Sequence, residues 1–168
     1  LVGTDSTGTL NSADGNTGVG TGVLGALTTG DNNTAVGKGA LTTNTTGACN
    51  TALGQGSLDA NTTGSNNTAV GRVALLSNTT GGQNTSVGAC ALDANISGAN
   101  NTAAGFEALG ANTTGQSNVA IGKDALDSNT TASNNTAVGT DALQANTTGQ
   151  DNTAFGSQAL LVATTATA

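Results

Sequence analysis

An Asn-Thr-Ala-apolar-Gly motif, or a close relative of it, recurs at every seventeenth position along this chain of 168 residues. The motif begins at Asn16, Asn33, Asn50, Asn67, Asn84, Asn101, Asn118, Asn135 and Asn152. Nine units therefore cover residues 16–168, and residues 1–15 fit as a partial coil before them. A fixed short period is the signature of stacked architectures, in which each unit covers its neighbours. We therefore predict a single repeat domain over residues 1–168.

The length of the unit decides between helical and β architectures. Helical repeats need roughly 33 to 47 residues for two helices and their turns. A parallel β-solenoid needs fewer, because each turn contributes short strands that pair with the turns above and below at roughly 4.8 Å. We therefore predict an all-β fold, a parallel β-solenoid or β-roll of about ten 17-residue coils.

Comparing the units with one another predicts which positions, numbered 1 to 17 from the Asn, are structural. Position 5 is always Gly, which indicates a positive φ or a close backbone approach. Position 4 is always apolar and position 9 is Leu in nine successive units, so we expect both rows to face inward. The predicted structural ladders include Asn33, Asn50, Asn67, Asn84, Asn101, Asn118, Asn135 and Asn152; Gly37, Gly54, Gly71, Gly88, Gly105, Gly122, Gly139 and Gly156; Val36, Leu53 and Val70; and Leu41, Leu58 and Leu75.

A second Asn row stands at position 12, and Gly recurs at position 15, where we expect a second corner. The Asn row consists of Asn44, Asn61, Asn78, Asn95, Asn112, Asn129 and Asn146. Most of these residues start an Asn-x-Thr glycan acceptor motif. The flanking units carry Leu10, Leu27 and Ala163 at this position, so we expect it to face at least partly inward, which argues against glycosylation there.

Composition and charge exclude several functions. The chain has no His, two Cys and three basic residues, so it lacks the groups for a His-based general base, a His-containing zinc site or the usual triad. We predict no enzyme and no cofactor. The net charge of −7 argues against nucleic-acid binding, and no apolar run reaches the roughly 18 residues of a membrane helix.

The charged side chains gather at positions 6, 7, 10, 16 and 17, which we expect to face solvent. Glu107, Asp124 and Asp141 share position 7 in three successive turns, and a calcium ion could relieve this column of like charges. Solvated carboxylates are the simpler interpretation. Cys49 and Cys90 share no row and lie more than two turns apart, so we expect no disulfide between them.

One turn buries few apolar residues, and the free energy gained by burying them is smaller than the conformational entropy cost of ordering the 17 residues of the unit. Association along the apolar wall would add burial without ordering more chain, so we expect self-association. Among oligomers we favour a homotrimer, although burial alone does not set the number of chains. The chain begins at Leu1 and ends in an apolar stretch without a cap. Because an open end is an unpaired strand edge, we expect either a longer native chain or copies stacked end to end in a filament.

The units at 33–41 and 118–126 resemble the head repeats of trimeric autotransporter adhesins, whose period is shorter. In that family a left-handed parallel β-roll packs into a trimer. The full unit, with Asn-Thr-Thr-Gly at 61–64 and 112–115, resembles repeats of phage-type tail fibres and bacterial surface fibre proteins. The resemblance implies a shaft or adhesive section of a fibre at the cell surface, outside the cell or on a virion, with a cell-surface or glycan receptor. It carries over no binding residue.

Two Thr rows favour a different function. Regular Thr arrays on a flat β-solenoid face are typical of ice-binding proteins, and Thr fills positions 13 and 14 in most units. Adjacent residues of a straight strand alternate faces, so one of these rows points outward. The candidate ice-facing or surface-facing residues are Thr45, Thr62, Thr79, Thr113, Thr130 and Thr147.

Overall fold

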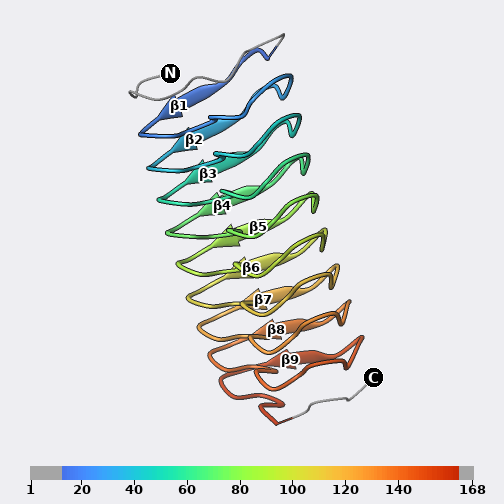
Figure 1. Cartoon of the computed structure of the whole chain (residues 1–168). Coiled ribbons are helices and arrows are strands. Elements are labelled where there is room, and N and C mark those ends of the chain that lie inside the picture. Colours follow the sequence, from blue (N-terminus) through green and yellow to red (C-terminus); the bar gives the residue numbers. More distant parts are fainter. Residues whose placement is uncertain (1–12, 163–168) are drawn as a thin grey trace.

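The computed structural model describes residues 13–162, which wind into one parallel β-solenoid without a helix (Figure 1). The predicted fold class is thus confirmed. Our expectations for the partial coil before residue 13 and for the apolar end after residue 162 lie outside the described residues. Across the described range no helix is long and apolar enough to cross a membrane.

Each turn contributes one strand of three residues to a single sheet with the order β1 to β9. Every strand pairs in parallel with the next, and each residue lies opposite its counterpart in the following unit, as Thr34 lies opposite Thr51. The strands are β1 (Thr17–Val19), β2 (Thr34–Val36), β3 (Thr51–Leu53), β4 (Thr68–Val70), β5 (Thr85–Val87), β6 (Thr102–Ala104), β7 (Val119–Ile121), β8 (Thr136–Val138) and β9 (Thr153–Phe155).

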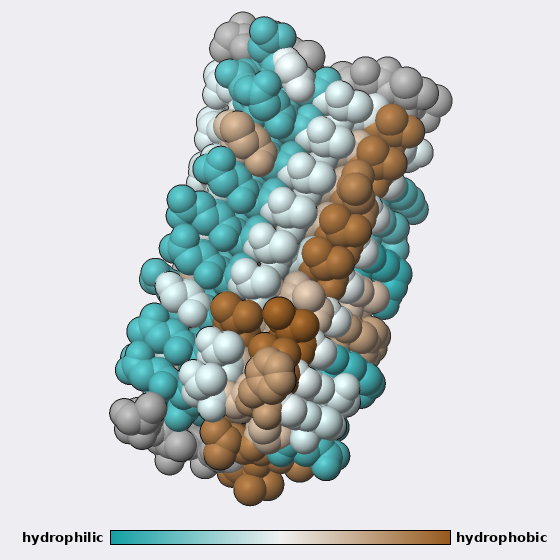
Figure 2. Space-filling model, turned by 180° about the vertical axis from the view of Figure 1, so that it is seen from behind, coloured by the Kyte–Doolittle hydropathy of each residue, from teal (hydrophilic) through white to brown (hydrophobic). Residues whose placement is uncertain are grey.

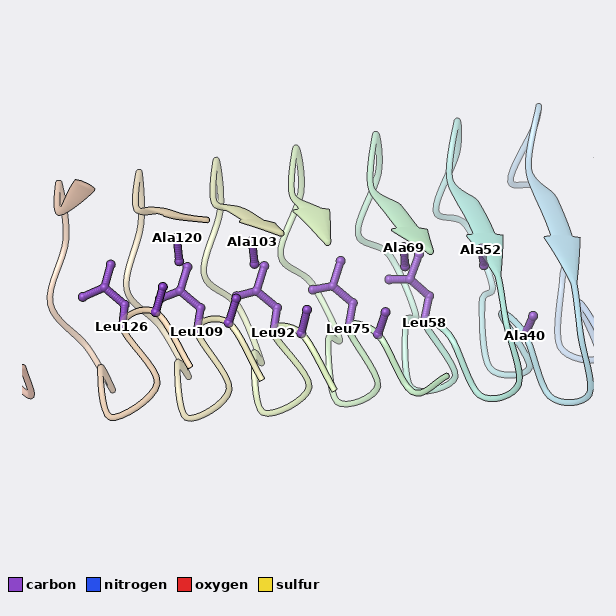
Figure 3. Close-up of a cluster of buried hydrophobic side chains, with 14 of the residues drawn as sticks. Ala40, Ala52, Leu58, Ala69, Leu75, Leu92, Ala103, Leu109, Ala120 and Leu126 are labelled. Carbon is purple, nitrogen blue, oxygen red and sulfur yellow. The ribbon is translucent and has the colours of Figure 1, made fainter. Parts of the chain in front are cut away.

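The core is a narrow column of Leu and Ala side chains (Figure 3). Leu at position 9 is fully buried in the central turns, for example Leu58 and Leu75, which confirms that this row faces inward. Ala at positions 3 and 8, such as Ala69 and Ala74, fills the space beside it.

The apolar row at position 4 does not face inward as predicted. Val36 is 37% exposed and Leu53 is 38% exposed, whereas the Ala before each of them is fully buried. Side chains alternate along a strand, so the middle residue of each three-residue strand points inward and positions 2 and 4 point outward. The recurrence of apolar residues at position 4 predicted that they are buried, but the inward position of each strand is position 3, which holds Ala in most strands.

The Gly at position 5 meets both expectations, since its φ lies between +120° and +144°. A Cβ on Gly37 would lie 2.6 Å from the carbonyl oxygen of Gly54 in the next turn, closer than real contacts allow. Leu at position 9 also adopts a positive φ, about +51° at Leu41 and Leu58. This conformation costs a non-Gly residue about 1–2 kcal/mol, so the stack holds the Leu row against its local preference.

Candidate functional site

The Asn row at position 1 forms a buried hydrogen-bonded ladder, which we call the position-1 ladder. The Nδ2 of Asn50 donates to the carbonyl oxygen of Gly64 at 2.9 Å. Its Oδ1 accepts a hydrogen bond from the backbone N–H of Asn67, one turn on, also at 2.9 Å. The pattern recurs along the stack and satisfies side-chain and backbone groups together, as a buried amide requires.

The Asn row at position 12 forms the position-12 ladder, which is also buried. The Nδ2 of Asn61 donates to the Oδ1 of Asn44 at 2.8 Å and to the carbonyl oxygen of Gly64 at 2.9 Å. That carbonyl therefore accepts from both ladders and joins them across the coil. The side-chain amides of these Asn-x-Thr motifs are engaged inside the folded chain, in agreement with the inward orientation that we predicted.

Gly occurs at position 15 because neighbouring atoms leave little room for a Cβ there, and not because the backbone adopts a left-handed conformation. Its φ is not positive, but a Cβ on Gly64 would overlap the carbonyl oxygen of Gly81 and the Oδ1 of Asn61. Ala132 takes the place of Gly in one turn. Left-handed corners instead occur at position 7 and at position 17, for example at Asp141 and Asn66.

The Thr residues that we expected on a surface are largely engaged within the stack. At position 13, Thr45 and Thr62 each donate a hydroxyl hydrogen bond to the carbonyl oxygen of the following turn, both at 3.0 Å. Thr79 and Thr113 do the same. Thr130 is exposed and Thr147 is half-buried. The row at position 14 is exposed throughout the described turns.

One exposed surface was not predicted from the sequence. We define the outer sheet face as the outward side chains at positions 2 and 4 of β1 to β9. Figure 2 shows it as an apolar column, drawn brown, beside a column of intermediate hydropathy, drawn white. Position 2 is Thr in every strand except β7, which has Val119. The Thr-Ala-Val pattern could have predicted this surface, because a strand that buries the small Ala must expose the Thr and Val on either side of it.

Both aromatic residues of the chain lie outside its core. Phe155, at position 4 of β9, is 84% exposed. Phe106 follows the apolar column at position 6 and is 44% exposed. No Tyr or Trp occurs in the sequence, so the fold uses no aromatic side chain for internal packing.

The acidic column that could have held calcium has an exposed cation, Lys123 at position 6, beside it. Lys123 pairs with Asp124, and this hydrogen bond, followed by the charges of Asp124, Asp141 and Glu107, raises the lysine pKa. Residues 13–162 contain no group of three or more Cys, Asp or Glu side chains placed to hold a metal ion. The expectation that positions 7 and 10 face solvent is wrong in part, since Asp124 is buried.

Two carboxylates at position 10 are also less exposed than predicted. Burial is the main cause that raises the pKa of Asp93 and of Asp127 above the ordinary value of 3.8. For Asp127, the neighbouring charges of Asp124 and Glu107 add to this effect. The two cysteines are free, with Cys49 exposed and Cys90 half-buried.

Comparisons with models of known protein families, with curated proteins and with solved structures gave no match. The arrangement itself therefore carries the functional argument. It offers a uniform stack with internal ladders, a charged rim at variable positions, and an apolar outer sheet face.

Proposed function

We propose that this chain is a stiff shaft section of a fibre that lies outside the cell, on the cell surface or on a virion. It acts mechanically and has no catalytic role. The observation that carries the proposal is the continuity of the position-1 ladder, which together with the backbone hydrogen bonds joins each turn to the next from Asn16 to Asn152 without interruption.

A regular cross-section supports the same proposal. Every full turn between Asn16 and Asn152 has the same length, and no loop projects from the stack (Figure 1). A chain of this kind separates its two ends by a fixed distance and offers a protease few mobile segments. These are the properties that a spacer in a fibre needs.

The positions that differ most from turn to turn are candidates for contact with a receptor. Positions 6, 7, 10, 16 and 17 carry every charged residue, and they vary while the ladder positions remain nearly constant. In the proposed homotrimeric fibre they tune solubility and the contact with a cell-surface or glycan receptor. The stack supplies stiffness without depending on them.

Small-angle scattering combined with digestion by proteinase K tests the shaft proposal. We expect a rod of about 40 Å for nine strands spaced by about 4.8 Å, with the repeat region resistant to the protease. A flexible, rapidly digested chain would contradict the proposal. Electron micrographs of the same sample separate short rods from long particles of variable length, and the latter would favour filaments of chains stacked end to end.

Ice binding is the second candidate, and the outer sheet face favours it. Thr and Val have nearly the same shape, so positions 2 and 4 form a regular array of mostly β-branched side chains, with Leu53, Ala104 and Phe155 as the exceptions. This array differs from the predicted one, since hydroxyls at position 13 are engaged within the stack. Measurement of thermal hysteresis tests it. Ice shaping that is lost in Thr68→Leu would support ice binding, and its absence in the unaltered chain would exclude it.

A further inference from the structure

We infer that the outer sheet face is the surface along which copies of this chain pack against one another. The inference rests on the proposed fibre, and it names the surface and the partner in that assembly. The partner is a second copy of the same chain, lying lengthwise over β1 to β9.

The first argument is the placement of apolar side chains. The chain buries a small residue on the inward side of each strand, Ala in seven of the nine described strands, and leaves a larger Val, Leu, Ile or Phe outside in most strands. A continuous exposed apolar column is unusual for a chain that functions alone, and such patches mark interaction surfaces. Phe155 belongs to this column, and Phe106 at position 6 adds a second exposed aromatic side chain. Aromatic residues are enriched in interfaces.

The second argument is electrostatic. The net charge is −7, and every Asp, Glu, Lys and Arg stands at position 6, 7, 10, 16 or 17. Two copies that approached through these positions would bring mainly carboxylates together. Positions 2 and 4 hold no charged residue in any turn, so copies that meet through the outer sheet face keep their acidic rims in solvent.

The third argument is periodicity and size. A surface ribbed at roughly 4.8 Å is matched along its whole length by a surface with the same spacing, which a second copy provides. Nine strands give a face about 40 Å long and, with its side chains, about 12 Å wide. Contact over this face covers about 1,000 Å² for a pair, the lower limit for a specific interface. We therefore expect reversible association that depends on protein concentration.

The test replaces Val36, Val70 and Val87 by Thr in one variant, V36T/V70T/V87T. Thr keeps the β-branched shape and the strand preference, and these side chains point outward, so the turn is expected to fold unchanged. The matched control, T46V/T80V/T114V, adds the same apolar groups at position 14 of three turns. Sedimentation velocity over a range of concentrations measures the mass of each protein, and circular dichroism checks its fold.

We expect two or three times 15.8 kDa for the unaltered chain and for the control. For the Thr variant we expect association weakened by about tenfold or more, because apolar contacts in the centre of the face are lost. Phe155→Ser is the second variant, since a side chain that is 84% exposed contributes little to folding. It should weaken association while circular dichroism stays unchanged.

Other outcomes separate this inference from the fibre proposal. If the unaltered chain associates and neither variant weakens it, the inference is overturned while the fibre proposal stands. A single-chain mass at every concentration overturns the inference and the proposed homotrimer, although a rigid rod in scattering would still support a shaft. If the unaltered chain shapes ice while it has a single-chain mass, the face binds ice and the inference is wrong.

Discussion

The two Asn ladders and the outer sheet face belong to the same turns, yet they reverse the usual placement of polar and apolar groups. Asn50 and Asn61 are fully buried, while Val36 and Leu53 are more than one-third exposed. The difference shows that, in this stack, hydrogen bonding between equivalent residues of adjacent turns determines which side chains are buried. A side chain that bonds to its own counterpart in the adjacent turn is stable inside, whatever its hydropathy.

The cost of a buried amide explains why the ladders must be continuous. An unpaired buried polar group costs about 1–3 kcal/mol, whereas a paired one is stabilising. Each Asn at position 12 in the centre of the stack is both a donor to the preceding turn and an acceptor from the following one. The outer sheet face has no such dependence, because its side chains make no ladder of their own.

The largest effect is expected where backbones of successive turns meet. Gly37→Ala would place a Cβ 2.6 Å from the carbonyl oxygen of Gly54, at a φ of +127°. We expect a loss of about 4 kcal/mol in unfolding free energy, measured by urea denaturation. Gly39→Ala in the same turn is the control, since the nearest atom to its Cβ would be Thr42 Oγ1 at 3.6 Å. Equal destabilisation by both changes would contradict the close approach.

Breaking a ladder should have the next largest effect. Asn78→Leu removes the hydrogen bonds to Asn61 and Gly81 and the one accepted from Asn95. We expect a loss of about 3 kcal/mol, because amides in both neighbouring turns lose a partner. Thr80→Ala, at an exposed position of the same turn, should change stability by less than about 0.5 kcal/mol. A small effect of Asn78→Leu would show that hydropathy outweighs the ladder, since Leu27 fills this position near one end.

Adjacent residues of one strand sharpen the comparison between inside and outside. Ala69→Val adds two methyl groups to a fully buried site and should destabilise the chain by about 2 kcal/mol. Val70→Thr changes a partly exposed side chain in the same strand and should have an effect near zero at protein concentrations where copies do not associate. Thermal unfolding of both variants checks this. The reverse order would place the core on the other side of the sheet.

The smallest effect is expected from the charged rim. Because the folded pKa of Asp93 and of Asp127 is raised above 3.8, the folded chain binds these protons more tightly than the unfolded chain does. Their stabilising contribution is complete below the unfolded pKa and is lost as the pH rises through the raised folded pKa. We expect Asp127→Asn to raise the melting temperature slightly at pH 7 and to lose this advantage in acid. An advantage that persists in acid would point to a cause other than ionisation.

The fold and the register were predictable because one repeated unit determines both. The Leu row, the Gly at position 5 and the position-12 ladder also followed from comparing turns. The orientation of position 4 did not, since a row of Val is consistent with a core and with an interface. The left-handed φ of Leu41 and Asp141 could not be read from residue type, because pairing with neighbouring turns imposes it.

Identical joints between successive turns have a consequence for length. Because each turn bonds to the next through the same registers, removing or inserting one whole unit would change the rod by about 4.8 Å and leave its cross-section intact. In the shaft that we propose, the number of repeats would therefore set the length of the rod. Duplication or deletion of whole units would then change that length without a new sequence having to be selected.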